Sequence, residues 1–217
     1  MLLQILTYTH HLTTMLFGIF LSAFFLGVKQ NKKNVCILLG GGAVSGLFFL
    51  ICNTVFGSLF TEAVYPIFVH LPLFLLLVFY YRFRWLPSII SIMTAYLCCQ
   101  FSNWAGIFAL SLSGLDWVYY LVRIIVTVAV FAFLSRYLCQ TTALLFAKSD
   151  RELYILGAMP FVYYVFDYST TKFSMLLYSG NKVVVEFLAF AMCISYVIFL
   201  FVYFQEYELK NQIGRAS

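Results

Sequence analysis

Seven long apolar runs, separated by short polar connections, constrain this chain more than any other feature of its sequence. A helix needs about 20 apolar residues to cross the ~30 Å hydrocarbon core of a bilayer, and these runs meet or approach that length. Within hydrocarbon, every backbone N–H and C=O group must be paired inside the protein, which a helix achieves within its own segment. We therefore predict an all-α, polytopic membrane bundle of seven transmembrane helices. The predicted spans are residues 5–28, 35–60, 64–81, 86–113, 117–138, 153–172 and 183–204.

The composition supports the same class of protein. Of the 217 residues, 64% are hydrophobic and only 10% are charged, whereas an average soluble domain has about 25% charged residues. A soluble domain of this length buries only ~70% of the surface of its unfolded chain, so the surplus apolar surface must face lipid. The runs also lack the period-two alternation of barrel strands. The net charge of +5 lies in short clusters between the runs, which argues against nucleic acid as a partner.

Lysine and arginine set the expected orientation, because positively charged short loops stay in the cytoplasm. The even-numbered connections carry only Lys172 and Lys182, whereas the odd-numbered connections are rich in basic residues. We therefore expect the N-terminus outside and the C-terminus in the cytoplasm. The odd-numbered connections contain Lys29, Lys32, Lys33, Arg82, Arg84, Arg136, Lys148 and Arg151.

The last run continues into a charged segment. Residues 205–212 are rich in helix formers and contain no proline or glycine, so we expect the seventh helix to leave the bilayer and to stop near Gly214. This divides the chain into a transmembrane bundle, residues 1–204, and a cytoplasmic juxtamembrane helix, residues 205–217. That helix is either the start of a signalling connector or an ordinary charged anchor. The N-terminus lacks the basic region and cleavage site of a signal peptide, so the first span should be retained.

Polar residues inside the spans are the first candidates for function, because a charge at the bilayer centre costs about 2.5–3.5 kcal/mol on insertion scales. With the expected orientation they cluster between the midplane and the outer surface. Our hypothesis is a polar pocket open to the outside, in which Arg123 pairs with Asp167. The side-chain amides of Gln100 and Asn103 would offer hydrogen bonds to a ligand. The alternative is that these groups have only a structural role. They would then form hydrogen bonds between neighbouring helices, and the long side chain of Arg123 would reach the membrane–water interface. The candidate ligand-binding residues are His70, Gln100, Asn103, Trp104, Arg123 and Asp167.

The other motifs favour packing over activity. Gly42 and Gly46 form a G-x-x-x-G pair, which permits close approach of two helices in a membrane. Pro72 and Pro160 lie within apolar runs and are expected to bend their helices. The six cysteines show no metal or disulfide spacing, so we interpret them as small hydrophobic residues.

Motifs for catalysis are missing from the sequence. It contains no H-E-x-x-H, no glycine-rich phosphate loop and no G-x-S-x-G, and no motif places Asp167 and Glu186, the carboxylates inside the spans, together. We therefore expect no catalytic residue, metal or cofactor in this chain. His10 and His11 lie at the expected outer border, where they either sense pH or are ordinary wet interfacial residues.

Three local strings resemble a known family. They are YPIFVHLPLFLLLVFYYRFRWL (65–86), AYLCCQFSNW (95–104) and FVYYVFDYSTTKFSMLLYSGNKVVVEF (161–187). They are similar to the membrane sensor region of bacterial histidine kinases of the GHKL ATPase class, relatives of the peptide-pheromone receptors of Gram-positive quorum sensing. The resemblance implies a homodimeric multi-span receptor in the bacterial plasma membrane. Its last helix would continue into a dimerisation and phosphoacceptor helix, followed by an ATP-binding domain.

The sequence departs from that plan at its C-terminal end. Its histidines, His10, His11 and His70, all precede the last span, so no phosphoacceptor residue can be assigned. The chain is then either a part of a longer kinase or a homologue without phosphotransfer chemistry. The leading interpretation is a sensor module for an outside peptide or small-molecule signal, with a cytoplasmic response regulator as partner only if a kinase domain follows. A small transporter or substrate-binding membrane subunit is the chief alternative, ahead of a membrane enzyme and a structural membrane protein.

Overall fold

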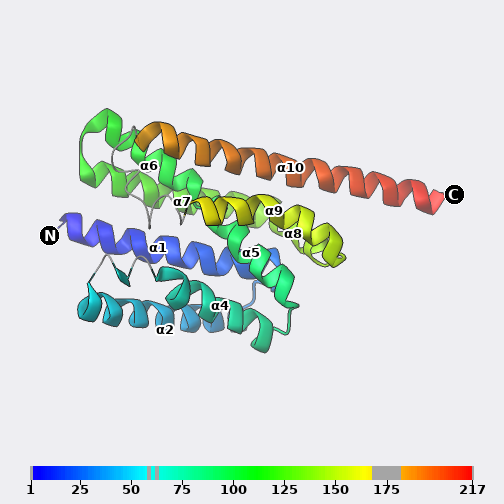
Figure 1. The fold of residues 1–217 in the computed structure, drawn as a ribbon, viewed down its shortest axis with the longest axis horizontal. Coiled ribbons are helices and arrows are strands. Elements are labelled where there is room, and N and C mark those ends of the chain that lie inside the picture. The colour runs from blue at the N-terminus through cyan, green and yellow to red at the C-terminus, as the bar shows by residue number, and fades with distance from the viewer. Residues whose placement is uncertain (1, 58–59, 62–63, 168–181, 217) are drawn as a thin grey trace.

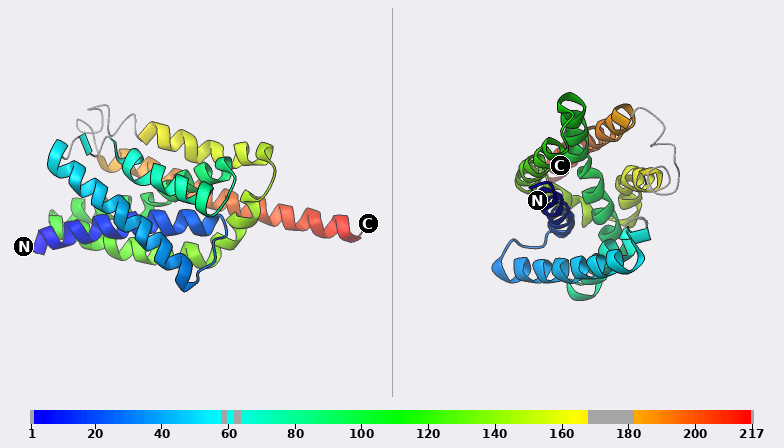
Figure 2. Two further views of the ribbon diagram at one scale, coloured as in Figure 1. Left: turned by 90° about the horizontal axis from the view of Figure 1, so that it is seen from below. Right: turned by 90° about the vertical axis from the view of Figure 1, so that its left-hand side faces the viewer.

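The computed structural model describes residues 2–57, 60–61, 64–167 and 182–216, and most of these residues are helical (Figure 1). The helices pass back and forth along an elongated bundle, with the N-terminus at one end and the C-terminus at the other (Figure 1, Figure 2). The all-helical class predicted from the sequence is therefore confirmed. In chain order the elements are α1 (Leu2–Phe25), α2 (Lys32–Phe56), η1 (Pro66–His70), α4 (Leu71–Leu75), η2 (Leu76–Tyr80), α5 (Trp85–Cys98), α6 (Gln100–Ser113), α7 (Asp116–Tyr137), α8 (Cys139–Phe146), α9 (Asp150–Asp167) and α10 (Lys182–Ala216).

Length and composition support a membrane protein with several spans, but they do not confirm seven. α1 is long but carries His10, His11 and several threonines, whereas Pro66–Tyr80 is apolar but shorter than a full span. α9 begins with the charged residues Asp150 and Arg151. The helices in the described part of the chain that are long and apolar enough to cross a membrane are Lys32–Phe56, Trp85–Ser113, Asp116–Tyr137 and Phe187–Leu209.

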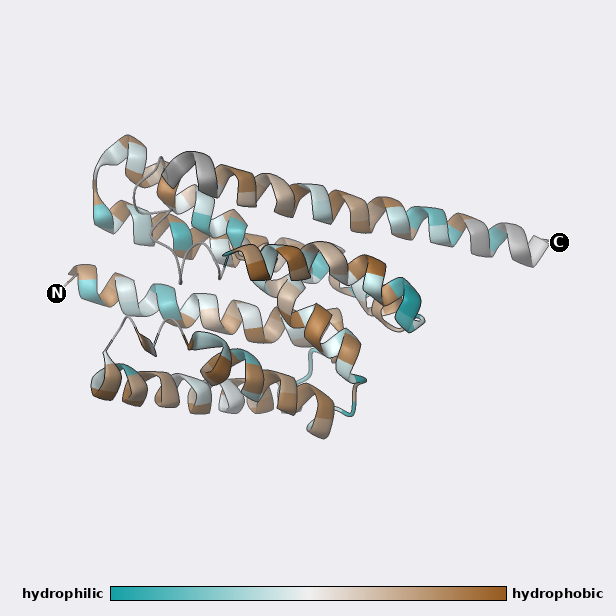
Figure 3. Ribbon diagram, viewed as in Figure 1, coloured by the Kyte–Doolittle hydropathy of each residue, from teal (hydrophilic) through white to brown (hydrophobic). Residues whose placement is uncertain are grey.

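α10 runs without a break from Lys182 to Ala216, and its C-terminal part projects beyond the other helices (Figure 1, Figure 2). The helix expected over 205–212 is therefore observed, whereas the expected stop near Gly214 is wrong because α10 passes this residue. Figure 3 shows hydrophobic residues along most of the bundle and hydrophilic residues in the projecting part of α10. The predicted end of the sixth span, residues 168–172, lies outside the described residues.

The third predicted span is an interrupted helix. Two π-helical segments, η1 and η2, flank the short α4. At the end of η1, the N–H of Leu71 donates to the carbonyl of Pro66, five residues earlier. The next residue is Pro72, which has no N–H to donate within a helix. Pro72 therefore lies at the change of helix type, and His70 lies directly before it; π-helical turns occur frequently at functional sites.

The predicted connection after the fifth span is itself a helix, α8. Its side chains at Cys139, Leu145 and Phe146 are buried, because α8 packs against the end of α1. Gly27 ends α1 with a positive φ of 86°, and a Cβ at this glycine would lie 3.3 Å from the Cβ of Ala143. The apolar residues of 139–146 thus fold onto the bundle instead of forming a polar loop.

We call the part of the bundle around the C-terminal half of α1 the packed half. From Leu21 to Phe25 every residue of α1 is buried. On the neighbouring pair of helices, α5 and α9, Gly157 approaches so closely that a Cβ there would lie 2.7 Å from Cδ1 of Ile90. Glycine is therefore required at this position to let the two helices touch.

Pro160 in α9 has a specific partner on α10. A regular helix would pair the carbonyl of Leu156 with the N–H of residue 160, but proline has no N–H. The hydroxyl of Tyr196 on α10 donates to this carbonyl at 2.8 Å, and Tyr196 is almost completely buried. A neighbouring helix thus satisfies the backbone group that the proline leaves free, as is required inside a bilayer.

The G-x-x-x-G pair on α2 lies against α1, as expected for a packing motif. A Cβ at Gly42 would lie 3.1 Å from Cδ1 of Ile19, and a Cβ at Gly46 would lie 3.4 Å from Cε of Met15. The two helices therefore meet near the middle of α2.

Candidate ligand-binding cavity

A cavity of about 890 Å³ runs from the N-terminal end of the bundle towards its middle, lined by residues of α1, α2, η1, α4, α5, α6, α7 and α9. We call this region the open half. Ligand sites commonly have volumes of about 300–1,000 Å³. Five of the six predicted ligand-binding residues line the cavity, and they come from four elements far apart in the sequence. These residues are His70 of η1, Gln100 and Asn103 of α6, Arg123 of α7 and Asp167 of α9. Their ligand-binding role stays a prediction.

Arg123 is positioned by a glycine that the sequence did not single out. A Cβ at Gly106 of α6 would lie 2.3 Å from Cγ and 2.8 Å from Cδ of Arg123, so the aliphatic stem of the arginine fills the space above this glycine. The guanidinium Nη1 donates a hydrogen bond to the hydroxyl of Tyr119. Its Nε is buried and has no hydrogen-bond partner among the described residues. Arg123 itself lines the cavity, and no carboxylate among the described residues forms an ion pair with it.

The expected ion pair between Arg123 and Asp167 is not among the ion pairs of the described residues. Arg123 bonds instead to Tyr119, and Asp167 accepts a hydrogen bond from the hydroxyl of Tyr96. The physical reason is the packing: α7 packs on α1 and α6, whereas α9 packs on α5. The two charges therefore belong to different walls of the cavity.

His70 lies in a cluster of tyrosines. Its Nδ1 is hydrogen-bonded to the hydroxyl of Tyr164 at 2.8 Å, and its ring makes edge-on contacts with Tyr65 and Tyr96, with ring centroids 5.3 and 5.7 Å apart. This cluster ties η1 to α5 and α9 beside the interruption at Pro72. Such contacts hold the imidazole in one orientation at the cavity wall.

The polar residues of α6 have different surroundings. The side-chain amide of Asn103 donates to Oε1 of Gln100 at 3.2 Å, and both residues line the cavity. Trp104 does not line it, so its predicted ligand contact is not supported by the structure. Its indole stacks on Phe190 of α10, with ring centroids 4.4 Å apart and planes inclined by 14°. Trp104 therefore joins α6 to α10.

α1 forms the wall that sequence analysis missed. His10 is only 3% exposed, which is inconsistent with a wet interfacial residue, and it bonds through Nδ1 to the hydroxyl of Thr14 at 3.3 Å. Polar and small residues recur along α1 at helical spacing and face the cavity, and this periodic stripe is the signal that could have identified the wall. The stripe comprises Thr7, His11, Thr14, Gly18 and Ser22.

The deeper part of the cavity is apolar. Met15, Ile19, Leu73 and Ile92 line it. The hydroxyl of Ser22, which also lies there, donates to the carbonyl of Gly18 at 2.7 Å within its own helix. The cavity is thus amphipathic, with its charged and amide groups nearer the N-terminal end of the bundle and hydrocarbon side chains below them.

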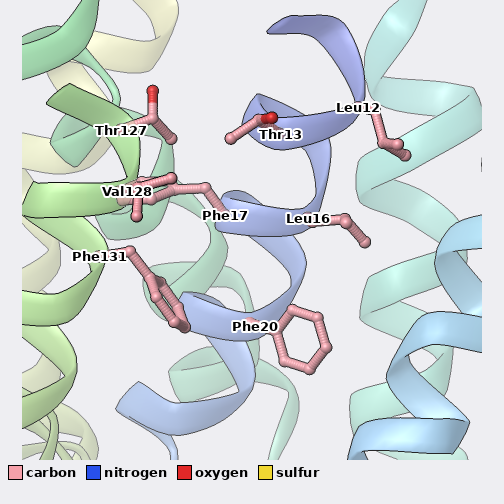
Figure 4. Close-up of a pocket in the computed structure, with 8 residues that line it drawn as sticks. All are labelled: Leu12, Thr13, Leu16, Phe17, Phe20, Thr127, Val128 and Phe131. Carbon is pink, nitrogen blue, oxygen red and sulfur yellow. The ribbon is translucent and has the colours of Figure 1, made fainter. Parts of the chain in front are cut away.

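A second, smaller pocket of about 200 Å³ lies between α1 and α7. Figure 4 shows that aliphatic and phenylalanine side chains dominate its lining, with Thr13 and Thr127 as the hydroxyl groups. The hydroxyl of Thr13 already donates to the carbonyl of Thr9. With no charged group in its lining, this pocket is a weaker candidate than the large cavity.

Comparison of the chain with protein-family models, with curated proteins and with solved structures finds no match. The resemblance to sensor histidine kinases therefore stays a prediction from local strings.

Proposed function

We propose that this chain is a membrane receptor module in which a ligand in the cavity changes the position of α10. One observation carries the proposal: a helix that forms a wall of the cavity, α6, is joined to the projecting helix, α10, by stacked aromatic rings. Asn103 lines the cavity, and the next residue, Trp104, stacks on Phe190 of α10. A ligand can shift the equilibrium between two arrangements of α6 and α10 if it binds one arrangement more tightly than the other.

A second set of contacts links the far end of the cavity wall to α10. Arg84, which follows η2 and precedes α5, pairs with Asp150 at 2.8 Å and donates to the backbone carbonyl of Lys148. The ammonium group of Lys148 lies 3.5 Å from the ring centroid of Tyr207 on α10 and 4.8 Å from that of Tyr203. The connection before α9 therefore contacts α10 directly through Lys148, and the connection before α5 contacts the connection before α9 through Arg84.

The proposed topology has seven passes, with the N-terminus outside and the C-terminus in the cytoplasm of a bacterial cell. The alternating direction of the helices along the bundle (Figure 1) supports this arrangement, together with the basic residues of the odd-numbered connections. Fusions of alkaline phosphatase and of green fluorescent protein after Asn31, Leu115, Ser149 and Glu206 test it. We expect phosphatase activity only after Leu115 and fluorescence only after the other three residues. Phosphatase activity without fluorescence after Ser149 would place this connection outside and would reduce the topology from seven passes to five.

Coupling between the cavity and α10 is tested by filling the cavity. A Cβ at Gly18 would meet no atom within 4 Å, and Gly18 lines the cavity, so Gly18→Leu places a side chain in the ligand space. Gly40 also has no atom within 4 Å of its Cβ position but is exposed on α2, so Gly40→Leu is the matched control. The distance between spin labels at Gln140 of α8 and Gln205 of α10 is measured in lipid nanodiscs, with the labels attached to genetically encoded ketone residues.

We expect Gly18→Leu to change this distance by about 2 Å, the scale of helix shifts in switching proteins, and Gly40→Leu to leave it unchanged. Equal distances in both variants and the unsubstituted protein would mean that the cavity and α10 are uncoupled, which contradicts the receptor proposal.

The kinase part of the proposal has its own test. Sequencing of the native transcript beyond the codon for Ser217 shows whether the reading frame continues. A following histidine-containing helix and ATP-binding domain would make this chain the sensor part of a homodimeric kinase that acts on a response regulator. A stop codon would leave a receptor module without phosphotransfer.

A small transporter is the second candidate, and the interrupted helix favours it. Broken helices at membrane depth line the binding sites of many transporters, and residues of η1 and α4, together with Cys99 at the break between α5 and α6, line this cavity. A cysteine placed at Ser22 discriminates the two functions. A transporter exposes this position to a membrane-impermeant thiol reagent from the cytoplasmic side in one of its states, whereas a receptor open only to the outside does not.

A further inference from the structure

The charged and apolar parts of the cavity define the chemistry of its occupant. Arg123 carries a full positive charge at the cavity, has no carboxylate within ion-pairing distance among the described residues, and keeps its buried Nε without a partner. Asn103 and Gln100 line the same cavity with their amides. Arginine binds carboxylate and phosphate groups with two parallel hydrogen bonds. The Arg123 region is therefore suited to an anionic group.

Below this level the cavity continues for a considerable depth. His10, whose ring lies 5.8 Å from that of Tyr120 on α7, marks the level of Arg123 on α1. From the level of His10, residues of α1 line the cavity as far as Ser22, a length of about 18 Å at the rise of 1.5 Å per residue. The space is therefore long in the direction of the helices.

We propose that the cavity binds a single-chain anionic amphiphile, with its carboxylate or phosphate head group on Arg123 and its hydrocarbon chain in the deep part between α1, α2, α4 and α5. This inference rests on the proposed function and specifies the ligand of the same cavity. The carboxylate of Asp167 does not compete for Arg123, because it is engaged by Tyr96 on a different wall.

A hydrocarbon chain fits the deep part better than a peptide does. A peptide brings an N–H and a C=O group for each residue, and each such group costs several kcal/mol when it is buried in an apolar space without a partner. The deep lining offers mainly aliphatic side chains, such as Ile19 and Ile92, and the hydroxyl of Ser22 is already bonded within α1. A methylene chain has no such groups and gains free energy from burial.

The entrance is bounded by α2. This helix touches α1 at Gly42 and Gly46, and beyond them its residues Phe49, Leu50 and Asn53 line the cavity. The ribbons of α1 and α2 diverge towards the N-terminal end of the bundle (Figure 2). A hydrocarbon chain that enters there would pass the aromatic side chain of Phe49 and the amide of Asn53.

Photolabelling tests the proposal. The purified protein in nanodiscs of neutral lipid is labelled with a diazirine analogue of palmitic acid, and the labelled residues are mapped by mass spectrometry. We expect labels on α1 and α2 residues that line the cavity. Arg123→Gln should reduce this labelling about tenfold, as expected for loss of charge-assisted hydrogen bonds, whereas Arg123→Lys should retain a large part of it because it keeps the charge.

The chain offers a steric control as well. Gly18→Leu, which fills the deep part, should abolish labelling inside the cavity, whereas Gly40→Leu should leave it unchanged. Gel filtration of each variant shows whether it is folded. Labelling of the cavity that is equal in Arg123→Gln, Gly18→Leu and the unsubstituted protein would overturn the proposal.

A competition experiment distinguishes a carboxylate head group from a phosphate head group. Palmitic acid, a lysophosphatidic acid and the methyl ester of palmitic acid are compared as competitors of the label. Stronger competition by the free acid indicates a carboxylate ligand, and stronger competition by the lysophosphatidic acid indicates a phosphate; both agree with the proposal. Equal competition by the neutral ester would overturn it, because the ester has no charge for Arg123.

The same samples separate this inference from the receptor proposal. Palmitic acid is added to the spin-labelled protein used for the α10 distance. Cavity labelling without any change in this distance would contradict the receptor function while retaining the amphiphile site. A distance change in Gly18→Leu, combined with no labelling by the amphiphile, would contradict the ligand class while retaining the receptor function.

Discussion

Gly157 in the packed half and Gly18 in the open half are both helical glycines, but their surroundings differ completely. A Cβ at Gly157 would collide with Ile90 at 2.7 Å, whereas a Cβ at Gly18 would meet nothing within 4 Å. α1 shows the same change along a single helix: His10 is the only described residue buried before Phe17, and burial becomes nearly continuous after it. One half of the bundle therefore holds the helices in position, and the other half leaves space between them.

The two halves also differ in how their polar groups are satisfied. In the packed half the hydroxyl of Tyr196 donates a hydrogen bond to the backbone carbonyl of Leu156 in α9, which Pro160 leaves without a partner in its own helix. In the open half Nε of Arg123 is buried without a partner among the described residues. A buried polar group without a partner is destabilising by about 1–3 kcal/mol, and proteins retain such costs mainly at functional sites. This contrast points to the open half as the functional region.

The largest expected effect comes from the same substitution in both halves. Gly157→Leu forces α5 and α9 apart and should lower the free energy of unfolding by about 3 kcal/mol, at the upper end of overpacking effects. Gly18→Leu should be neutral or slightly stabilising, because leucine has a higher helix propensity and enters empty space. The midpoint of thermal unfolding, followed by fluorescence-detected gel filtration, checks both. Equal loss in the two variants would show that the halves are packed alike.

A smaller effect is expected at the contact of α10 with Pro160. Tyr196→Phe leaves the carbonyl of Leu156 without a donor and should be destabilising by about 1–2 kcal/mol. In a Pro160→Ala background the helix can pair this carbonyl itself, so Tyr196→Phe should then have a much smaller effect. The double-mutant cycle of thermal midpoints measures the difference. Identical losses in both backgrounds would assign the effect to the other contact of this hydroxyl, with Thr94, instead of to the carbonyl of Leu156.

Gly106→Ala should alter the open half with little effect on stability. The new methyl group displaces the stem of Arg123, and since this flexible side chain can move, we expect a loss of only about 1 kcal/mol. The displaced guanidinium should react faster with phenylglyoxal, as measured by mass spectrometry of the Arg123 peptide. Gly40→Ala serves as the control. An unchanged reaction rate would show that Gly106 does not position the arginine.

The smallest expected effect concerns the contact of Lys148 with α10. Lys148→Gln removes the cation–π contacts with Tyr203 and Tyr207 and the ion pair with Glu152, and should lower stability by about 0.5–1 kcal/mol. Tyr207→Phe keeps an aromatic ring beneath the ammonium group and should match the unsubstituted protein. Thermal midpoints measured at low and at high salt check this. A loss in Tyr207→Phe as large as in Lys148→Gln would assign the contact to the hydroxyl group instead of the ring.

Part of the site could be predicted because depth follows from position along a helix. With a constant rise per residue, Gln100, Asn103 and Arg123 are predicted between the midplane and the outer surface, and the structure places all three at one cavity. The direction of a side chain is harder to predict. Consecutive helical residues differ by about 100° around the axis, so Asn103 lines the cavity while Trp104 faces α10.

The predicted pairing of Arg123 with Asp167 was wrong for a related reason. Opposite charges at similar depth suggest a pair, but contact requires that their helices be neighbours. α7 and α9 pack on different helices, so Arg123 bonds to Tyr119 and Asp167 to Tyr96. The wall formed by α1 was not predicted, because its signal is the helical spacing of small and polar residues along α1 and not any single residue.

The sequence by itself determined that the chain is helical, that several helices are apolar enough to span a bilayer, and that the last helix continues beyond the bundle. These properties follow from local composition and from the requirement that each helix satisfy its own backbone. Only the tertiary structure decided which helices touch, where Gly157 and Gly106 permit close contact, and that a cavity remains at Arg123. Helix neighbours depend on how side chains of distant segments fit together, and no local pattern in the chain specifies that fit.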